Sequence, residues 1–260
     1  MSQATEVNRT WDDLWKENPS CRPVDTEHDS ISILTRTLIE NLSCNQMTFL
    51  DVGSGPGSRS VPIVGSKEGV QLILLDQSRT ALELAQQNTN ESISAQYVQA
   101  DGFQLPFPDR SITCVFANGV NEHFLDPERQ QLIDEMTRVV KPNGYIALMV
   151  PNKLNPFHTA SKIISEKRGS WKFGPQYDFT PNELQQRMAD AGLEDIKSFG
   201  VGAFTSWIRI LPHERQGKYY QSPTPFKELN NILWRLDAQT SSSINRNFGR
   251  EILVLARKPQ

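Results

Sequence analysis

The sequence predicts a doubly wound α/β fold, in which parallel strands alternate with helices. Apolar runs typical of buried strands recur through the first 150 residues, with helical spacing between them. Three of these runs end at an aspartate, Asp51, Asp76 and Asp101, at intervals of 25 residues. The first run leads directly into a glycine-rich turn and then a helix, which is how such folds hold a nucleotide-like ligand.

The glycine-rich turn lies within Phe49–Ser60, where glycines occupy alternate positions after the first strand. Such glycines let the backbone turn sharply and bring a ligand against the main chain, facing the next helix's N–H groups. A dinucleotide-binding turn would place its third glycine one residue later, so the spacing favours another cofactor. A purely structural turn is the alternative for such a match taken alone. The candidate cofactor-binding residues here are Asp51, Gly53, Ser54, Gly55 and Gly57.

The next three strand ends carry further polar candidates. Asp76, at the end of the second run, is placed to accept hydrogen bonds from both hydroxyls of a ribose. Asp101 follows the third run, where its carboxylate can accept from an adenine amino group, and the fourth run is Ser111–Ala117. The candidate cofactor-binding residues at these ends are Asp76, Gln77, Asp101, Gly102, Asn118 and Gly119.

In this order and at these distances, the motifs resemble those of class I S-adenosylmethionine-dependent methyltransferases, of the type 11 subgroup that includes ubiquinone and menaquinone methyltransferases. The resemblance covers about residues 47–200 and the final strand, Arg250–Ala256, and includes the Lys-Pro-x-Gly stop at 141–144. It implies a Rossmann-like, seven-stranded, mostly parallel sheet with an antiparallel last strand and a helical, aromatic lid insertion. It also implies S-adenosyl-L-methionine as the cofactor, while no motif specifies the methyl acceptor.

Capping residues and apolar spacing predict the helices. Ser78 is a candidate N-cap for the helix after the second strand, and Asp126 and Pro127 are expected to start another as N-cap and first-turn proline. That helix is expected to end at Pro142–Gly144, before a fifth strand. The apolar stripe of the helix preceding the first strand is Ile31, Leu34, Leu38 and Leu42.

A further helix is expected to open at Thr180–Glu183, whose pattern fits a capping box, and to stop at Gly192. Later in the chain, apolar residues at helical spacing predict one more helix with a single apolar side. The residues of that side are Phe226, Leu229, Ile232, Leu233 and Leu236.

The length suits one domain over residues 1–260. Residues 1–46 are expected to form an N-terminal helical cap and residues 47–150 the cofactor-binding core. Two stretches, 151–179 and 201–248, exceed the short connections that this fold needs. Because ligands bind at the carboxyl ends of the strands, where both stretches emerge, we expect them to form a substrate lid.

The second stretch combines aromatic and basic side chains, which suit a small-molecule acceptor that is anionic and partly apolar. The alternative is that the aromatic side chains form the insertion's own core. Near the N-terminus, Trp11 and Trp15 would share one helix face, where they either pack on the core or close over the site. The candidate lid residues are Trp207, His213, Arg215, Lys218, Tyr219 and Tyr220.

The composition bears on the protein's localisation and on whether it binds nucleic acid or a metal. No apolar run approaches the roughly 18 residues of a membrane span, and the polar start lacks the build of a secretory signal, so a soluble cytoplasmic protein is expected. The net charge is −3, with −9 over residues 1–150 and +5 over residues 151–250. The positive excess of the second stretch is too small to indicate nucleic-acid binding. Three distant cysteines and four scattered histidines give no metal-binding pattern, and the oligomeric state stays open.

Methyl transfer from a sulfonium needs a base only when the accepting oxygen, carbon or nitrogen must lose a proton. His123, in the segment Glu-His-x-x-Asp-Pro, is the candidate base, and the alternative is that it orients the loop. Some similar quinone methyltransferases bind a metal with such a Glu-His pair and a further carboxylate, which is Gly119 here, so no metal is predicted. A protein side chain as acceptor, or a non-catalytic cofactor-binding subunit, stays open as an alternative function.

Overall fold

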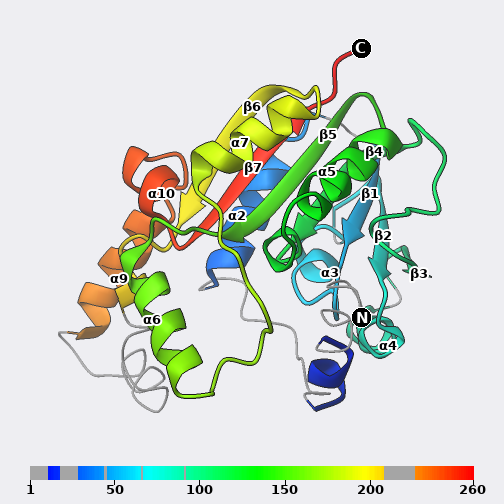
Figure 1. Cartoon of the computed structure of the whole chain (residues 1–260). Helices are drawn as coiled ribbons and strands as arrows, with labels where there is room; N and C mark the ends of the chain where they lie inside the picture. The colour runs from blue at the N-terminus through cyan, green and yellow to red at the C-terminus, as the bar shows by residue number, and fades with distance from the viewer. Residues whose placement is uncertain (1–10, 18–28, 44–45, 66, 91, 208–225) are drawn as a thin grey trace.

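The computed structural model describes residues 11–17, 29–43, 46–65, 67–90, 92–207 and 226–260 (Figure 1). Seven strands form one sheet in the order β3-β2-β1-β4-β5-β7-β6. Neighbouring strands from β3 to β5 pair in parallel, whereas β7 runs antiparallel to both β5 and β6. This confirms the predicted seven-stranded, mostly parallel sheet with an antiparallel last strand.

The sheet brings the carboxyl ends of its central strands to one edge. Val52, at the end of β1, lies opposite Leu75 in β2 and Ala117 in β4. The strand order reverses between β1 and β4, and ligands of open α/β sheets bind at such a reversal. The strands are β1 Met47–Val52, β2 Val70–Asp76, β3 Ala95–Gln99, β4 Ile112–Asn118, β5 Val140–Pro151, β6 Glu194–Val201 and β7 Glu251–Arg257.

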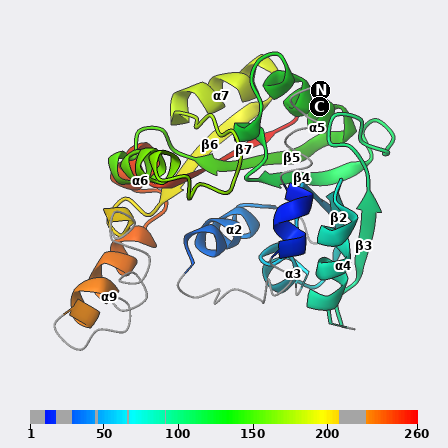
Figure 2. The ribbon, with the colours of Figure 1, turned by 60° about the horizontal axis from the view of Figure 1, so that its bottom comes forward.

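Helices cover both faces of the sheet (Figure 2). On one face, Leu34 and Leu38 of α2 are fully buried in a cluster with Phe49 of β1. On the other face, Leu132 of α5 and Leu184 of α7 are buried in a second cluster. The helices are α2 Ser30–Glu40, α3 Ser60–Ile63, α4 Arg79–Asn88, the 3-10 turn η1 Asn121–His123, α5 Glu128–Val139, α6 Pro156–Lys167, α7 Pro181–Asp190, α9 Phe226–Asp237 and α10 Ser243–Phe248, and residues 11–17 are also helical.

Two of the predicted helix starts are confirmed by their caps. The Ser78 hydroxyl accepts a hydrogen bond from the Ala81 N–H at 3.2 Å, at the start of α4. The Thr180 hydroxyl accepts from the Glu183 N–H at 3.2 Å, at the start of α7. Each cap satisfies one of the backbone donors that a helix start leaves without a partner.

The predicted start of α5 is wrong. Asp126 was expected to cap this helix, but its two carboxylate oxygens accept from Arg187 at 2.7 and 2.8 Å. The helix begins at Glu128, and its N-cap residue, Pro127, makes no side-chain capping bond. A bidentate pair with arginine outcompetes the cap because it satisfies both oxygens of the carboxylate at once.

The predicted end of α5 is also wrong. The helix ends at Val139, and Pro142–Gly144 lie within β5 instead of ending the helix. Val140 is fully buried and pairs with Ile112 of β4 across an irregularity in the register. Burial of Val140 in the sheet therefore extends the strand by five residues before the predicted start at Tyr145.

The insertion helix α9 forms as predicted, but its apolar side is not buried as a whole. The side chains of Leu229 and Ile232 are 45% and 53% exposed. Leu233 and Leu236 are partly buried. Among the described residues, α9 therefore does not bury its apolar stripe in a core of its own.

Replacing Gly200 with alanine is expected to lower the free energy of unfolding by about 1–3 kcal/mol. A Cβ atom at Gly200 in β6 would lie 1.8 Å from the backbone oxygen of Asn245. That oxygen cannot move freely, because the Asn245 side chain donates to the carbonyls of Leu236 and Gln239 at 2.9 and 3.1 Å. Urea denaturation measures the loss. Lys197→Ala, at an exposed position of the same strand, is the control, with a change below about 0.5 kcal/mol, and equal midpoints for the two variants would contradict this packing.

Candidate cofactor and substrate site

A cavity of about 730 Å³ opens at the carboxyl ends of β1, β2 and β4. This volume is typical of pockets that hold a small ligand. Ten of the eleven predicted cofactor-binding residues line it, and Gly57 does not. The ten are Asp51, Gly53, Ser54, Gly55, Asp76, Gln77, Asp101, Gly102, Asn118 and Gly119.

The glycine turn brings its backbone to the cavity wall. Gly53 and Gly55 have φ angles of +67° and +52°, which glycine adopts without the steric cost of a Cβ atom. A Cβ atom at Gly53 would lie 2.6 Å from Val120 Cγ2, and one at Gly55 would lie 3.0 Å from Trp15. Both positions therefore require glycine.

Gly57 supports the turn from behind. A Cβ atom there would lie 2.9 Å from Val61 Cγ2 and 3.0 Å from Leu74 Cδ1, two buried core side chains. Its φ angle of +63° adds a second requirement for glycine. The residue packs the turn against the core and does not contact the cavity.

Asp76 is bonded to the glycine turn. Its Oδ2 accepts from the Gly55 N–H at 2.8 Å and its Oδ1 from the Ser78 N–H at 2.8 Å. Desolvation raises the pKa of this carboxyl, while the two backbone donors act in the opposite direction. Each carboxylate oxygen can accept more than one hydrogen bond, so Asp76 can still bind ligand hydroxyls.

Asp51 and Asp101 differ in burial. Asp51 is 4% exposed and accepts a hydrogen bond from the Ser60 hydroxyl, and burial raises its pKa to about 7. Asp101 is exposed, and its Oδ1 accepts from the Phe103 N–H at 3.0 Å. The cavity therefore has a buried acidic group near the glycine turn and an open carboxylate at the β3 end.

The helical segment 11–17 contributes two tryptophans to the cavity lining, Trp11 and Trp15. Their rings stack with centroids 5.5 Å apart. The Ser78 hydroxyl donates to Asp12 at 2.8 Å, so this segment lies beside the start of α4 (Figure 2). Both interpretations of the tryptophan pair apply, because the two rings line the cavity and Trp11 also packs against a core cluster.

His123 connects the loop after β4 to the opposite wall. The residue is 3% exposed, and its Nδ1 lies 2.8 Å from the carbonyl oxygen of Pro175. That contact requires the proton on Nδ1, and burial lowers the pKa of the ring, so His123 is neutral with a lone pair on Nε2. Its ring also meets Trp11 edge-on at 5.2 Å.

Several cavity residues were not among the predicted site residues. The segment 171–178, here called the wall segment, contributes Trp171, Phe173 and Gln176, and the start of β7 contributes Arg250 and Glu251. Glu122 precedes His123 and also lines the cavity. Glu122 could have been found from its place directly after β4, but no sequence motif marks the other residues.

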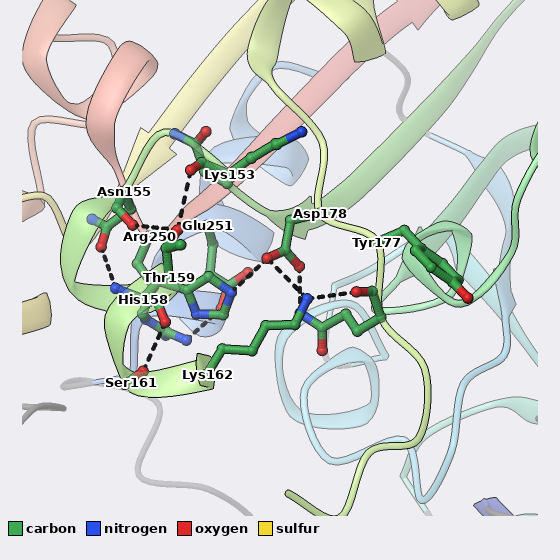
Figure 3. A network of polar contacts seen from close by, with 12 residues as sticks. Lys153, Asn155, His158, Thr159, Ser161, Lys162, Tyr177, Asp178, Arg250 and Glu251 are labelled. Atoms are coloured by element: carbon green, nitrogen blue, oxygen red, sulfur yellow. Dashed lines mark hydrogen bonds and ion pairs between the residues drawn. The ribbon is translucent and has the colours of Figure 1, made fainter. Parts of the chain in front are cut away.

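A buried polar network holds the wall segment in place (Figure 3). Asp178 Oδ2 lies 3.3 Å from both His158 Nε2 and Lys162 Nζ of α6. Lys162 also donates to the Gln176 carbonyl. Burial acts to raise the pKa of Asp178, but its contacts with His158, Gln176 and Lys162 lower it to about 2. The ionised carboxylate thus fixes the wall segment to α6.

Of the six predicted lid residues in the second insertion, the structure describes Trp207 alone. Trp207 is partly buried and is not among the lining residues. The other five candidates, His213, Arg215, Lys218, Tyr219 and Tyr220, lie outside the described residues. Among the described residues, segments 11–17 and 171–178 contribute tryptophan and phenylalanine side chains to the cavity lining.

The family of methyltransferase domains matches residues 50–148, which span β1 to β5 and the strand ends that line the cavity. Over these residues the chain is similar to a methyltransferase domain. Such a domain uses S-adenosylmethionine as its cofactor. No helix among the described residues is long and apolar enough to cross a membrane.

Two curated relatives illustrate the similarity of the methyltransferase domain. A Mycolicibacterium vanbaalenii protein named "uncharacterized methyltransferase" is 35% identical over 43% of this chain and 42% of its own length. The 2-methyl-6-phytyl-1,4-hydroquinone methyltransferase 1 of Oryza sativa subsp. japonica is 28% identical over 63% of this chain and 45% of its own length. The chain spans about half the length of the curated relatives it matches.

Solved structures share the fold of nearly the whole chain. A Thermotoga maritima S-adenosylmethionine-dependent methyltransferase, described as a possible histamine N-methyltransferase, aligns with a TM-score of 0.64 at 14% identity, covering 97% of this chain and 99% of that one. A Haemonchus contortus phosphoethanolamine N-methyltransferase 2 aligns with a TM-score of 0.57 at 19% identity, covering 88% and 53%. At these identities the likeness concerns the fold alone.

Proposed function

We propose that this chain transfers a methyl group from S-adenosylmethionine to a small, partly apolar molecule. One observation carries the proposal: a single cavity joins the glycine turn and the acidic strand ends to a chamber with aromatic walls. The aromatic side chains on those walls include Trp11, Trp171 and Phe173. We also propose that residues 1–260 act as one domain, with residues 1–46 as a cap over the core at 47–150.

The acidic strand ends suit the cofactor. When bound, S-adenosylmethionine supplies a methyl group already activated on a positively charged sulfur. Asp76 offers carboxylate oxygens to the ribose hydroxyls, Asp101 can accept from the adenine amino group, and Gly53 and Gly55 let the backbone approach closely. The residues proposed to hold the cofactor are Asp51, Gly53, Ser54, Gly55, Asp76, Gln77, Asp101, Gly102, Asn118 and Gly119, with Gly57 supporting the turn.

The part of the cavity with aromatic walls, here called the acceptor end, suits a small molecule better than a protein side chain. Aromatic rings from segments 11–17 and 171–178 line this end, and a small acceptor held between them can be aligned with the methyl group for an in-line displacement. His123 is the proposed base for acceptors that must lose a proton, because its neutral ring keeps a lone pair on Nε2. The names of the rice and Thermotoga proteins also refer to small-molecule acceptors.

Incubation with methyl-labelled S-adenosylmethionine and a filtered cell lysate tests the proposal. The label is expected to enter the small-molecule fraction with the wild-type chain and to fall to background with Asp76→Ala. Label that enters only the protein fraction would contradict a small-molecule acceptor. Label that stays in the cofactor would contradict methyl transfer altogether.

A further inference from the structure

The carboxyl group of Glu122 is buried in the cavity wall without a full set of partners. The residue is 2% exposed and lines the cavity. No donor among the described residues bonds to its Oε2. A buried acceptor without a hydrogen bond costs roughly 1–3 kcal/mol, so the site favours a ligand that presents a donor there.

Glu122 is held rigidly at the centre of the sheet edge. It lies in η1, just after β4, where the strand order reverses. Its Oε1 lies 3.6 Å from the position of a Cβ atom at Gly119, and its backbone oxygen accepts from the Tyr177 N–H at 2.6 Å. The carboxyl group is therefore fixed between the cofactor end of the cavity and the wall segment.

The electrostatic surroundings of Glu122 favour a positively charged ligand. Burial raises its pKa to about 8, with smaller contributions from Glu251 and Asp178 in the same direction and from Arg129 in the opposite one. The two arginines that line the cavity are each paired with a carboxylate. Arg250 pairs with Glu251, and Arg59 lies 3.2 Å from Asp29. The remaining carboxyl groups of the cavity, Asp51, Asp76 and Asp101, lie at its cofactor end. Lys162 and His158 contact Asp178.

The aromatic walls suit the same kind of ligand. Trp11, Trp171 and Phe173 line the cavity, with Trp11 and Phe173 centroids 6.1 Å apart and Trp171 and Phe173 centroids 5.1 Å apart. Aromatic faces attract ammonium groups and also bury apolar surface. A ligand with an apolar body and one ammonium group would satisfy both the rings and the carboxyl.

We propose that the methyl acceptor is an amine with an apolar body, which Glu122 binds as an ammonium ion between the aromatic walls. This rests on the proposed function. Glu122 then accepts one proton from the ammonium group and becomes a neutral carboxyl. The amine is left with the nitrogen lone pair that must attack the methyl carbon. For this acceptor Glu122, rather than His123, is therefore the base, and it both selects the acceptor and prepares its nucleophile.

Calorimetric titration of the protein loaded with S-adenosylhomocysteine tests the proposal with three probes of one shape: phenethylamine, 2-phenylethanol and phenylacetate. A charge-assisted bond to Glu122 predicts that phenethylamine binds at least about tenfold more tightly than either other probe. Glu122→Gln should remove this preference and leave the affinity for 2-phenylethanol unchanged. The matched control is Glu166→Gln, which removes an exposed carboxylate of α6 and should change nothing.

The pH dependence is compared between the wild-type chain and Glu122→Gln, because the buried Asp51 of the same cavity has a pKa of about 7 and is unchanged in the variant. An alkylammonium keeps its charge below about pH 10. Its affinity should therefore rise from pH 6.5 towards 8.5 as Glu122, with a pKa of about 8, becomes ionised, by up to about tenfold per pH unit. Equal binding of the three probes, tighter binding of phenylacetate, or no phenethylamine binding at millimolar concentration would each overturn the proposal of an amine acceptor. Because S-adenosylhomocysteine binding is measured first, its failure would count against the proposed function instead.

Discussion

Replacing Asp76 with alanine is expected to weaken the binding of S-adenosylhomocysteine by roughly tenfold to a hundredfold. The variant removes a charged acceptor for the ribose hydroxyls, which corresponds to about 1.5–3 kcal/mol for charge-assisted hydrogen bonds. It also frees the Gly55 and Ser78 N–H groups, each bonded to Asp76 at 2.8 Å. The glycine turn would therefore lose an anchor along with the ligand contact. Calorimetric titration measures the change directly.

Two further variants serve as comparisons for Asp76→Ala, one that keeps the shape of the side chain without its charge and one at a distant position. Asp76→Asn keeps one oxygen acceptor and is expected to lose less affinity than the alanine variant. Asp190→Ala removes an exposed carboxylate of α7, outside the cavity lining, and should bind as the wild type does. An Asp76→Ala protein that binds the ligand as tightly as the wild type would remove Asp76 from the site.

Replacing Arg129 with methionine is expected to lower the free energy of unfolding by about 3–5 kcal/mol, the cost of breaking a buried charged network. The Arg129 side chain is 7% exposed and lies 3.1 Å from Glu183 of α7. It donates to the carbonyls of Phe124, at 2.6 Å, and Tyr177, and its guanidinium lies 4.0 Å from the Phe179 ring centroid. Methionine keeps the apolar volume but leaves these acceptors buried without a donor.

Denaturation by urea, followed by circular dichroism, measures this loss, and the melting temperature should fall by about 6–20 °C. Arg79→Met is the matched control. Arg79 pairs with Glu83 on the surface of α4 with its side chain 78% exposed, and such pairs contribute little. A loss for Arg129→Met no larger than that of the control would show that the wall segment is held in another way.

The sheet and its cofactor edge could be predicted from sequence because they depend on local patterns. Apolar runs ending at Asp51, Asp76 and Asp101 gave three strands, and the resemblance to a known family supplied their order. Ser78 and Thr180 could be predicted as caps, because the atoms they bond lie three residues away. Asp126 could not, since its partner Arg187 is 61 residues distant in the chain.

The acceptor end of the cavity was less predictable for the same reason. The stretch 151–179 was expected at this end from topology, but no local pattern encodes the contact between Asp178 and α6 that holds segment 171–178 there. Glu122 lies beside His123 in the sequence. What distinguishes it is a buried oxygen that no described residue donates to, and this depends on tertiary contacts such as the one with Tyr177. The aromatic content of the second insertion led to the prediction that Trp207 is a lid residue, but Trp207 does not line the described cavity.

Titration of the wild-type chain with S-adenosylhomocysteine tests whether this cavity binds the cofactor. The cavity at the β1, β2 and β4 ends predicts one binding site per chain with a dissociation constant in the micromolar range, which corresponds to about −8 kcal/mol. A nicotinamide dinucleotide should not compete, because the third glycine of the turn precedes the position that dinucleotide binding requires. No binding of S-adenosylhomocysteine, together with tight binding of the dinucleotide, would contradict the account.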